Sequence, residues 1–264
     1  MPIDSDSLHW IPCLVLTNIQ TQERIGNEVI SLAPADDPEI VKLRKTHQEF
    51  DEFLSRFTDA FGVAINPSVI IVRDGSPMLF FQVDAIASFR DLIAASVIPL
   101  QRALEIARPR GHRIYYSDLF AVYPWMIDKS FEDIYAITPA ISAVHDISKF
   151  RGQSDPNVSS MILSQSDIDT PLFDALLERW IFRYGNPEPG WKDIAIFRSL
   201  NMANSAMQMP ASSDTTFHDY GRILALWVSA FEILGHPGIG KSGWKQIFDL
   251  LTNIDWHSSN IRNR

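Results

Sequence analysis

Cysteine is almost absent from this sequence, in which Cys13 is the only one. An internal disulfide is therefore excluded, and a reducing cytoplasm is the expected location. Long apolar runs are absent too, since no segment reaches the ~18 consecutive apolar residues of a membrane-spanning helix. The polar, acidic start Met1-Pro-Ile-Asp-Ser-Asp-Ser is unlike a secretory signal. We therefore expect a cytoplasmic protein with no membrane partner.

The motifs of several common enzyme classes are also missing. The sequence contains no HExxH, no paired CxxC, no GxSxG and no dinucleotide-binding fingerprint, which argues against zinc, serine-hydrolase and Rossmann chemistry. Asp167 and Asp169 could hold a divalent cation, but they directly precede Thr170-Pro171, where acidic residues favour a helix N-terminus. We accordingly expect no metal site and no cofactor.

What remains is the composition of an ordinary globular protein. The 264 residues are 46% hydrophobic and 21% charged, which is enough apolar material for one large domain or two modest ones. The net charge of −9 argues against a surface that coats nucleic acid broadly. It still allows a local basic patch.

Hydrophobic periodicity predicts an α+β domain over residues 1–155. The expected strands are residues 10–17, 27–32, 69–72 and 78–83, the last two joined into a hairpin by Asp74-Gly75. The expected helices are residues 39–57, with a core face of Ile40, Leu43, His47, Phe50 and Leu54, and residues 85–107, which Pro99 kinks or splits.

The sequence turns polar between residues 150 and 170, where we place a domain boundary. Beyond it the pattern is helical, and short connections are typical of an up-and-down bundle over residues 170–264. Because the last helix ends close to Arg264, we expect this bundle to be incomplete. The predicted fold class is therefore α+β, with a mixed α/β N-terminal domain and an all-α C-terminal bundle. The four expected helices are residues 171–182, 191–209, 217–234 and 244–254.

The segment Gly235-His-Pro-Gly-Ile-Gly240-Lys241-Ser242 matches the phosphate-loop pattern G-x-x-x-x-G-K-S/T. In a nucleotide-binding enzyme, Lys241 would contact the β- and γ-phosphates and Ser242 a magnesium ion. A phosphate loop needs a buried strand before it, whereas residues 217–234 carry apolar side chains at helical spacing. We therefore favour a helix that ends at Gly235 in the left-handed conformation, and the nucleotide-binding enzyme remains the alternative.

A cluster of positive charge lies between Glu105 and Asp118, a stretch without acidic residues. Arginines interleaved with aromatic rings can contact phosphates while bases stack on the rings. A solvated turn between a helix and a strand explains the same residues. The candidate nucleic-acid-binding residues are Arg108, Arg110, His112, Arg113 and Tyr115.

Two C-terminal phrases, Asp193-Ile-Ala-Ile-Phe-Arg-Ser-Leu-Asn-Met-Ala203 and Trp227-Val-Ser-Ala-Phe-Glu-Ile-Leu-Gly-His-Pro237, resemble uncharacterised bacterial proteins with a HEPN-like helical bundle. The resemblance implies a metal-independent ribonuclease motif in which an Arg and a polar residue precede a His. Arg262 and Asn263 match its opening, and no His follows them, so we do not expect catalysis.

The resemblance implies an RNA-directed or partner-binding protein of a defence or toxin-type system, which forms a homodimer through the bundle. A purely structural interaction module is a further alternative, since a fold does not fix a function.

Overall fold

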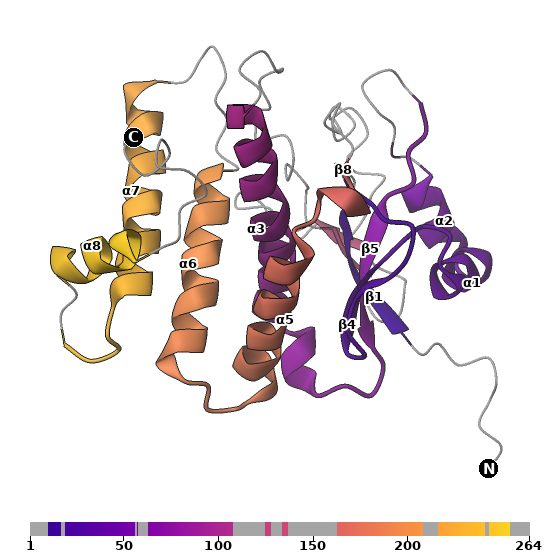
Figure 1. Cartoon of the computed structure of the whole chain (residues 1–264). Helices are drawn as coiled ribbons and strands as arrows, with labels where there is room; N and C mark the ends of the chain where they lie inside the picture. The colour runs from indigo at the N-terminus through magenta and orange to yellow at the C-terminus, as the bar shows by residue number, and fades with distance from the viewer. Residues whose placement is uncertain are drawn as a thin grey trace.

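The computed structural model describes residues 10–16, 19–55, 57, 63–107, 125–127, 134–136, 163–207, 216–240 and 243–253. These residues form successive layers, as Figure 1 shows. Two short helices cover one face of a β-sheet, and two long helices, α3 (Val83–Ala107) and α5 (Thr170–Gly185), cover the other. Helix α6 (Trp191–Met207) packs on the outside of that pair, and α7 (Phe217–Gly235) packs on α6. The described chain thus has the predicted α+β character, with an antiparallel sheet and a helical side.

The main sheet has six strands in the order β3-β4-β5-β1-β6-β7, and each neighbouring pair is antiparallel. Its side chains alternate between two cores, because successive residues of a strand point to opposite faces. Leu14 and Leu16 face the long helices, whereas Val15 faces the short ones. The strands are β1 (Trp10–Leu16), β3 (Ile25–Gly26), β4 (Ile30–Ala33), β5 (Ser68–Arg73), β6 (Trp125–Ile127) and β7 (Ile134–Ala136). A separate parallel pair joins β2 (Ile19–Gln20) to β8 (Leu163–Ser164).

The expected helix over residues 39–57 is two helices, α1 (Pro38–Thr46) and α2 (Gln48–Leu54). The backbone of His47 between them is extended, with φ −125° and ψ 97°. The hydroxyl of Thr46 donates to the carbonyls of Lys42 and Leu43, and such back-bonding weakens helix continuation. The predicted core face is nevertheless buried except for His47, which is half-buried.

The expected return strand over residues 78–83 is wrong. Residues Met78–Phe81 form a 3₁₀ helix, η1, that leads into helix α3 (Val83–Ala107). A hairpin partner has no free edge to join, because β5 already pairs with β1 on one side and β4 on the other. Phe80 instead stacks on Trp180, with ring centroids 5.1 Å apart. Helix α3 is continuous through Pro99, so the predicted split does not occur.

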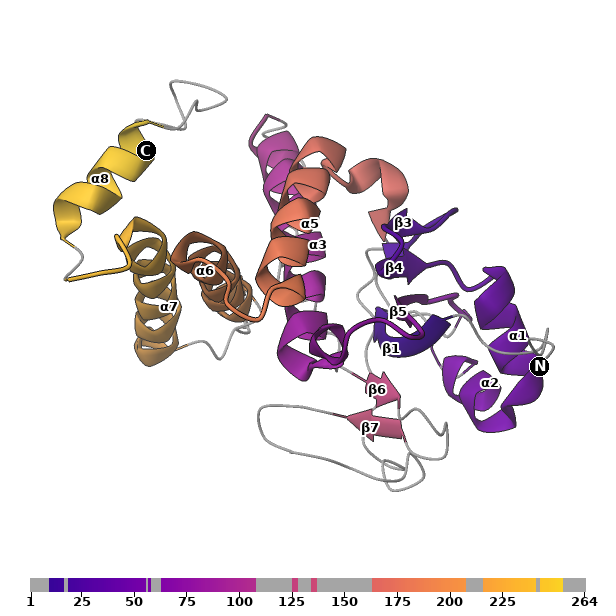
Figure 2. The same ribbon diagram turned by 90° about the horizontal axis from the view of Figure 1, so that it is seen from below.

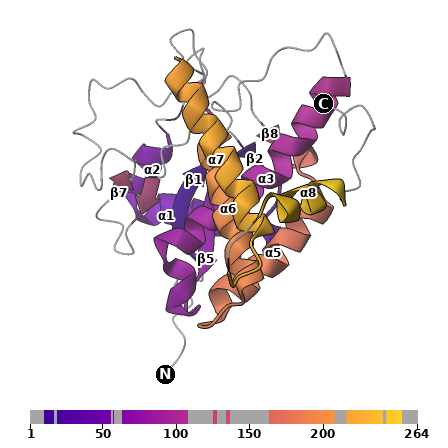
Figure 3. The same cartoon turned by 90° about the vertical axis from the view of Figure 1, so that its left-hand side faces the viewer.

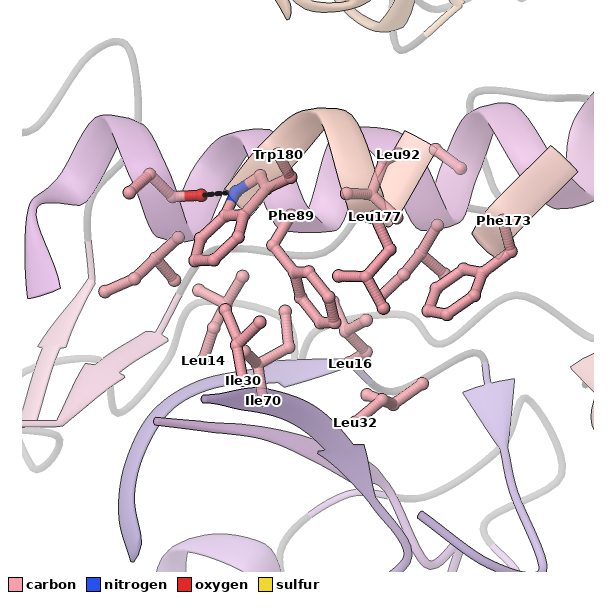
Figure 4. Close-up of a cluster of buried hydrophobic side chains, with 14 of the residues drawn as sticks. Leu14, Leu16, Ile30, Leu32, Ile70, Phe89, Leu92, Phe173, Leu177 and Trp180 are labelled. Atoms are coloured by element: carbon pink, nitrogen blue, oxygen red, sulfur yellow. Dashed lines mark hydrogen bonds between the residues drawn. The ribbon is translucent and has the colours of Figure 1, made fainter. Parts of the chain in front are cut away.

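The larger core lies between the sheet and the pair α3 and α5 (Thr170–Gly185) (Figure 4). Trp180 is at its centre and is fully buried. Its indole Nε1 donates to the carbonyl oxygen of Ala85 at 2.9 Å. Leu14 of β1, Phe89 of α3 and Phe197 of the next helix belong to the same cluster. One continuous core therefore joins side chains from both sides of the expected boundary at residues 155–170, and the division into two domains stays a prediction.

Three further helices complete the helical side. They are α6 (Trp191–Met207), α7 (Phe217–Gly235) and α8 (Trp244–Thr252). Seen from below, α3 with α5, then α6, then α7 follow one another away from the sheet (Figure 2). Helix α8 turns away from the end of α7 and packs there through Ile247, the buried residue of α8. Among the described residues, no helix has the length and apolar character needed to span a membrane.

Candidate functional site

Most of the predicted site residues lie outside the part of the chain that the structure describes. This holds for the basic cluster Arg108, Arg110, His112, Arg113 and Tyr115, and for Arg262 and Asn263. It also holds for Lys241 and Ser242 of the phosphate-loop pattern. These assignments stay predictions. The described residues do contain the rest of that pattern, residues 235–240.

The segment that enters residues 235–240 is a helix, as predicted, and not the strand that precedes a phosphate loop. The predicted left-handed Gly235 is wrong, however. Gly235 is the last residue of α7, and His236 follows it in an extended conformation, with φ −72° and ψ 128°. Gly235 instead allows α8 to pack close to the end of α7, since a Cβ at residue 235 would lie 3.3 Å from Cγ1 of Ile247 in α8. The left-handed residues are Gly238 and Gly240, with φ of +89° and +85°.

The turn between α7 and α8 is packed against the start of α6. The indole Nε1 of Trp191 donates to the carbonyl oxygen of His236 at 2.8 Å, and the two rings lie edge to face. His236 Nδ1 accepts the backbone N–H of Gly238 at 3.0 Å. One amide that a phosphate loop would direct at its anion is therefore satisfied within the turn. Beside it is a half-open cavity of about 280 Å³, lined by Trp191, Lys192, Ala195, Ile196, Leu234, His236 and Pro237.

The two carboxylates that were considered as metal ligands act as helix caps. Asp169 accepts the backbone N–H of Leu172 at 3.2 Å and caps the start of α5. Asp167, in the short 3₁₀ helix η3 (Gln165–Asp167), accepts the N–H of Ser164 at 2.8 Å. The interpretation as a helix start is thus confirmed for Asp169, whereas Asp167 belongs to the preceding 3₁₀ helix. Within the described ranges, no cluster of three or more His, Cys, Asp or Glu side chains could hold a metal ion.

A buried polar network joins α3 to α6. The carboxylate of Asp91, on α3, accepts from the guanidinium of Arg90 at 2.8 Å and from the amides of Asn204 at 2.6 Å and Asn201 at 3.2 Å. Desolvation raises the pKa of Asp91, and the hydrogen bonds and positive charge of Arg90 oppose that shift, as do the two amides. The donors that surround Asp91 come from α3 and α6 themselves, so the network holds the two helices together.

The most distinctive surface lies on α7. Six large apolar residues recur there at alternating steps of three and four, and we call them the outer stripe: Phe217, Tyr220, Leu224, Trp227, Phe231 and Leu234. Within α7, Ala230 alone is buried, and its carbonyl oxygen accepts the hydroxyl of Ser199 in α6 at 2.9 Å. Figure 3 shows α7 on the outside of the molecule, on the side away from the sheet.

The outer stripe is exposed over much of its length. Phe217 is 89% exposed, Leu224 65% and Tyr220 59%. Trp227 and Phe231 are half-buried and stack on each other, with ring centroids 6.2 Å apart. Helix α8 adds two exposed aromatic residues, Trp244 at 63% and Phe248 at 61%, one turn apart. An apolar surface of this kind marks an interaction site more often than scattered exposed residues do.

Sequence reasoning found the apolar pattern of α7 but did not predict whether that face is buried or exposed. The spacing that could have revealed the outer stripe is the strict alternation of steps, which repeats every seven residues. A helix that only faces a core does not need that regularity.

Comparisons with protein-family models, with curated proteins and with solved structures give no match for this chain. The HEPN-like resemblance therefore stays a prediction.

Proposed function

We propose that this chain is a partner-binding protein and that it binds an amphipathic helix of a protein partner along the outer stripe of α7. The observation that carries this proposal is the exposure of that stripe. Helix-to-helix recognition uses apolar anchors at steps of three and four residues, and the outer stripe supplies six of them in series. Seated against a second helix, these side chains would leave water without any change to the packing of α7 on α6.

The size of the apolar surface supports a stable complex. Phe217, Tyr220, Trp244 and Phe248 are between 59% and 89% exposed, about two thirds on average. An aromatic side chain offers roughly 200 Å², so these four expose roughly 500–600 Å² together. Summed over both ends of α7, this area is comparable to the largest contiguous apolar patch of an ordinary monomer, about 300–600 Å². With the exposed leucines of the stripe it approaches the ~800 Å² that each partner of a stable complex buries.

The charge pattern of α7 favours a protein partner over RNA. RNA binding needs positive charge that is available to phosphates. In α7, Arg222 lies 3.6 Å from the carboxylate of Asp219, and Glu232 adds a negative charge near the other end. Hydrogen bonds from the backbone and side chain of Thr216 lower the pKa of Asp219, which favours its negatively charged form. The RNA-directed part of the prediction depends on the cluster at residues 108–115, outside the described residues.

A pair of cross-linking positions tests this proposal. A photo-activated residue is placed at Leu224, in the centre of the outer stripe, or at Phe182, which is 52% exposed on α5 and serves as the matched control. After irradiation in the cells that express the full chain, we expect a discrete protein adduct from position 224 and none from position 182. The cross-linked protein is then purified, and its affinity for the chain is measured.

The variants Leu224→Glu and Phe182→Glu decide the result. The affinity for the cross-linked protein should fall at least a hundredfold with Leu224→Glu. With Phe182→Glu it should stay within twofold of the affinity of the unsubstituted chain. The proposal fails if position 224 gives no adduct or if the two variants bind alike. It also fails if ribonuclease treatment removes the adduct, since the partner would then be RNA.

A further inference from the structure

We infer that the helix bound on the outer stripe is α7 of a second copy of this chain, packed antiparallel to the first. This inference depends on the proposed function and names its partner. The two copies would be related by a two-fold axis that crosses α7 between Leu224 and Trp227. By that symmetry, Leu224 of each copy faces Trp227 of the other, and the two ends of the stripe face each other in turn.

The spacing of the outer stripe makes it complementary to itself. Its steps along the chain are three, four, three, four and three, a series that is the same when it is reversed. Two such helices can therefore interleave their side chains in antiparallel orientation over the whole stripe. The ends then meet as Phe217 with Leu234, and the next pair is Tyr220 with Phe231. Each exposed end residue is thereby covered by an apolar residue of the other copy.

The positions that flank the stripe carry no charge. On one side they are Gly221, Val228 and Gly235, and on the other they are Ile223 and Ala230. Like charges that face each other across an interface cost several kcal/mol. On the side away from α6, the flanking residues of one copy would meet flanking residues of the other, and because none of them is charged the usual penalty against self-association is absent. A Cβ added at Gly221 would meet no atom within 4 Å, so this flank leaves room for another helix.

Two features favour the antiparallel orientation. The dipoles of antiparallel helices oppose each other, which places the partially positive N-terminus of each α7 beside the partially negative C-terminus of the other. Helix α8 also projects outward from the C-terminal end of α7 (Figures 1 and 3). In an antiparallel pair, the exposed Trp244 and Phe248 of one copy lie near the N-terminal end of the other, where Phe217 is most exposed. In a parallel pair, the two α8 helices would compete for one end.

The mass of the purified full chain is the first test. Sedimentation velocity should give a species of twice the mass of one chain at micromolar concentration. Leu224→Glu should raise the dissociation constant of this dimer at least a hundredfold, because two carboxylates, one from each copy, would be buried near the axis when the copies pair. Phe182→Glu, on α5, should leave it unchanged. Phe217→Glu gives a second disruptive variant at a site so exposed that folding is not at risk.

Spin labels test the orientation. Ala225 and His218 are exposed and lie away from the stripe, so a cysteine at either position can be labelled without entering the interface. Cys13 is buried and does not compete. With a rise of 1.5 Å per residue, labels at position 218 should lie roughly 20 Å farther apart along the helix axis than labels at position 225. A parallel pair would give the same separation at both positions.

The outcomes separate this inference from the proposed function. If the chain is monomeric and position 224 still cross-links to another protein, the inference is contradicted and the proposed function is not. A monomeric chain without any such adduct would overturn both. A dimer that survives Leu224→Glu and Phe217→Glu, or one with equal label separations at positions 218 and 225, also contradicts the inference.

Discussion

Trp180→Ala tests whether the sheet and the helical side unfold as one unit. Trp180 belongs to α5, beyond the expected domain boundary, yet it is fully buried against elements that precede that boundary. Its ring centroid lies 5.1 Å from that of Phe80 and 5.9 Å from that of Phe89. Its indole also donates to the carbonyl oxygen of Ala85. The substitution removes all of these contacts at once.

The expected loss of stability is large. Truncation of a fully buried Trp to Ala costs about 3–5 kcal/mol, because the cavity is only partly refilled. Phe182→Ala is the matched control on the same helix, since Phe182 is 52% exposed and its truncation should cost less than ~1 kcal/mol. Both variants place alanine in the same helix, so the effect of its helix propensity is common to both. The difference between their losses of unfolding free energy therefore reports the burial of Trp180.

Cys13 supplies a probe in the sheet. It is the only cysteine, it is 5% exposed, and it lies in β1, an interior strand of the six-stranded sheet. When opening and closing are fast, its labelling by a thiol reagent follows the population of the unfolded state. If the core is one unit, a loss of 3–5 kcal/mol should speed the labelling of Cys13 by roughly 100- to 5,000-fold.

The refuting result is a separation of the two probes. Circular dichroism follows the helices during urea unfolding, and Cys13 labelling follows the sheet. If Trp180→Ala lowers the urea midpoint of the helices while Cys13 labelling stays at the rate of Phe182→Ala, then the sheet is stable without α5. Two independently folding domains, as the sequence predicts, would then describe the chain better than one continuous core.

Three further predictions follow from the site and the core. Asp91→Ala should lower the free energy of unfolding by about 3–5 kcal/mol in urea titrations, because it leaves a buried guanidinium and two amides without their acceptor. Burial of Tyr184 raises the pKa of its hydroxyl from 10.0 to about 12, mainly through desolvation. The native state therefore holds this proton more tightly than the unfolded state, so the free energy of unfolding should fall as pH rises from 10.0 to about 12. Tyr184→Phe should remove this pH dependence. Gly240→Ala should cost about 1–2 kcal/mol for its left-handed backbone alone, whereas Gly238→Ala should cost more in thermal unfolding, since its Cβ would also lie 3.0 Å from the ring of Trp191.

Local patterns predicted most of the elements that the structure contains. The helices over residues 191–209 and 217–234 have apolar residues at helical spacing, and the structure differs from them by a residue or two at the ends. The start of α5 was predicted from Thr170-Pro171, and the N-cap lies one residue earlier, at Asp169. Such signals lie within a few residues of each other, so they can be read without knowledge of the fold.

Tertiary pairing decided the elements that the sequence did not predict. Residues 78–83 are apolar and follow a strong turn at Asp74-Gly75, so a hairpin is the natural local prediction. The prediction failed because β1 and β4 occupy both edges of β5, which residues 74–83 cannot reveal. Phe80 was then available to pack on Trp180, a hundred residues later in the chain.

The candidate site was only partly accessible to sequence reasoning. The sequence predicted a helix, and not a strand, before the segment that matches the phosphate-loop pattern, and the structure contains that helix. The conformation of the turn was not predictable, because Gly235 is shaped by its contact with Ile247 and Gly238 by its contact with Trp191. Gly235 ends α7 and meets α8, whereas Gly238 lies in the turn and meets α6, and no local rule for glycine specifies either neighbour.

The outer stripe shows why burial cannot be inferred from hydrophobic pattern alone. A helix at the edge of a bundle needs one apolar face, and α7 meets that need with the face around Ala230, which packs on α6. The outer stripe from Phe217 to Leu234 lies beside that face, and α6 covers only part of it. A sequence with no interaction to make would gain solubility from polar residues at these positions. The exposed leucines and aromatic rings therefore support the proposed partner surface, and the reversible spacing of the stripe supports a second α7 as the proposed partner.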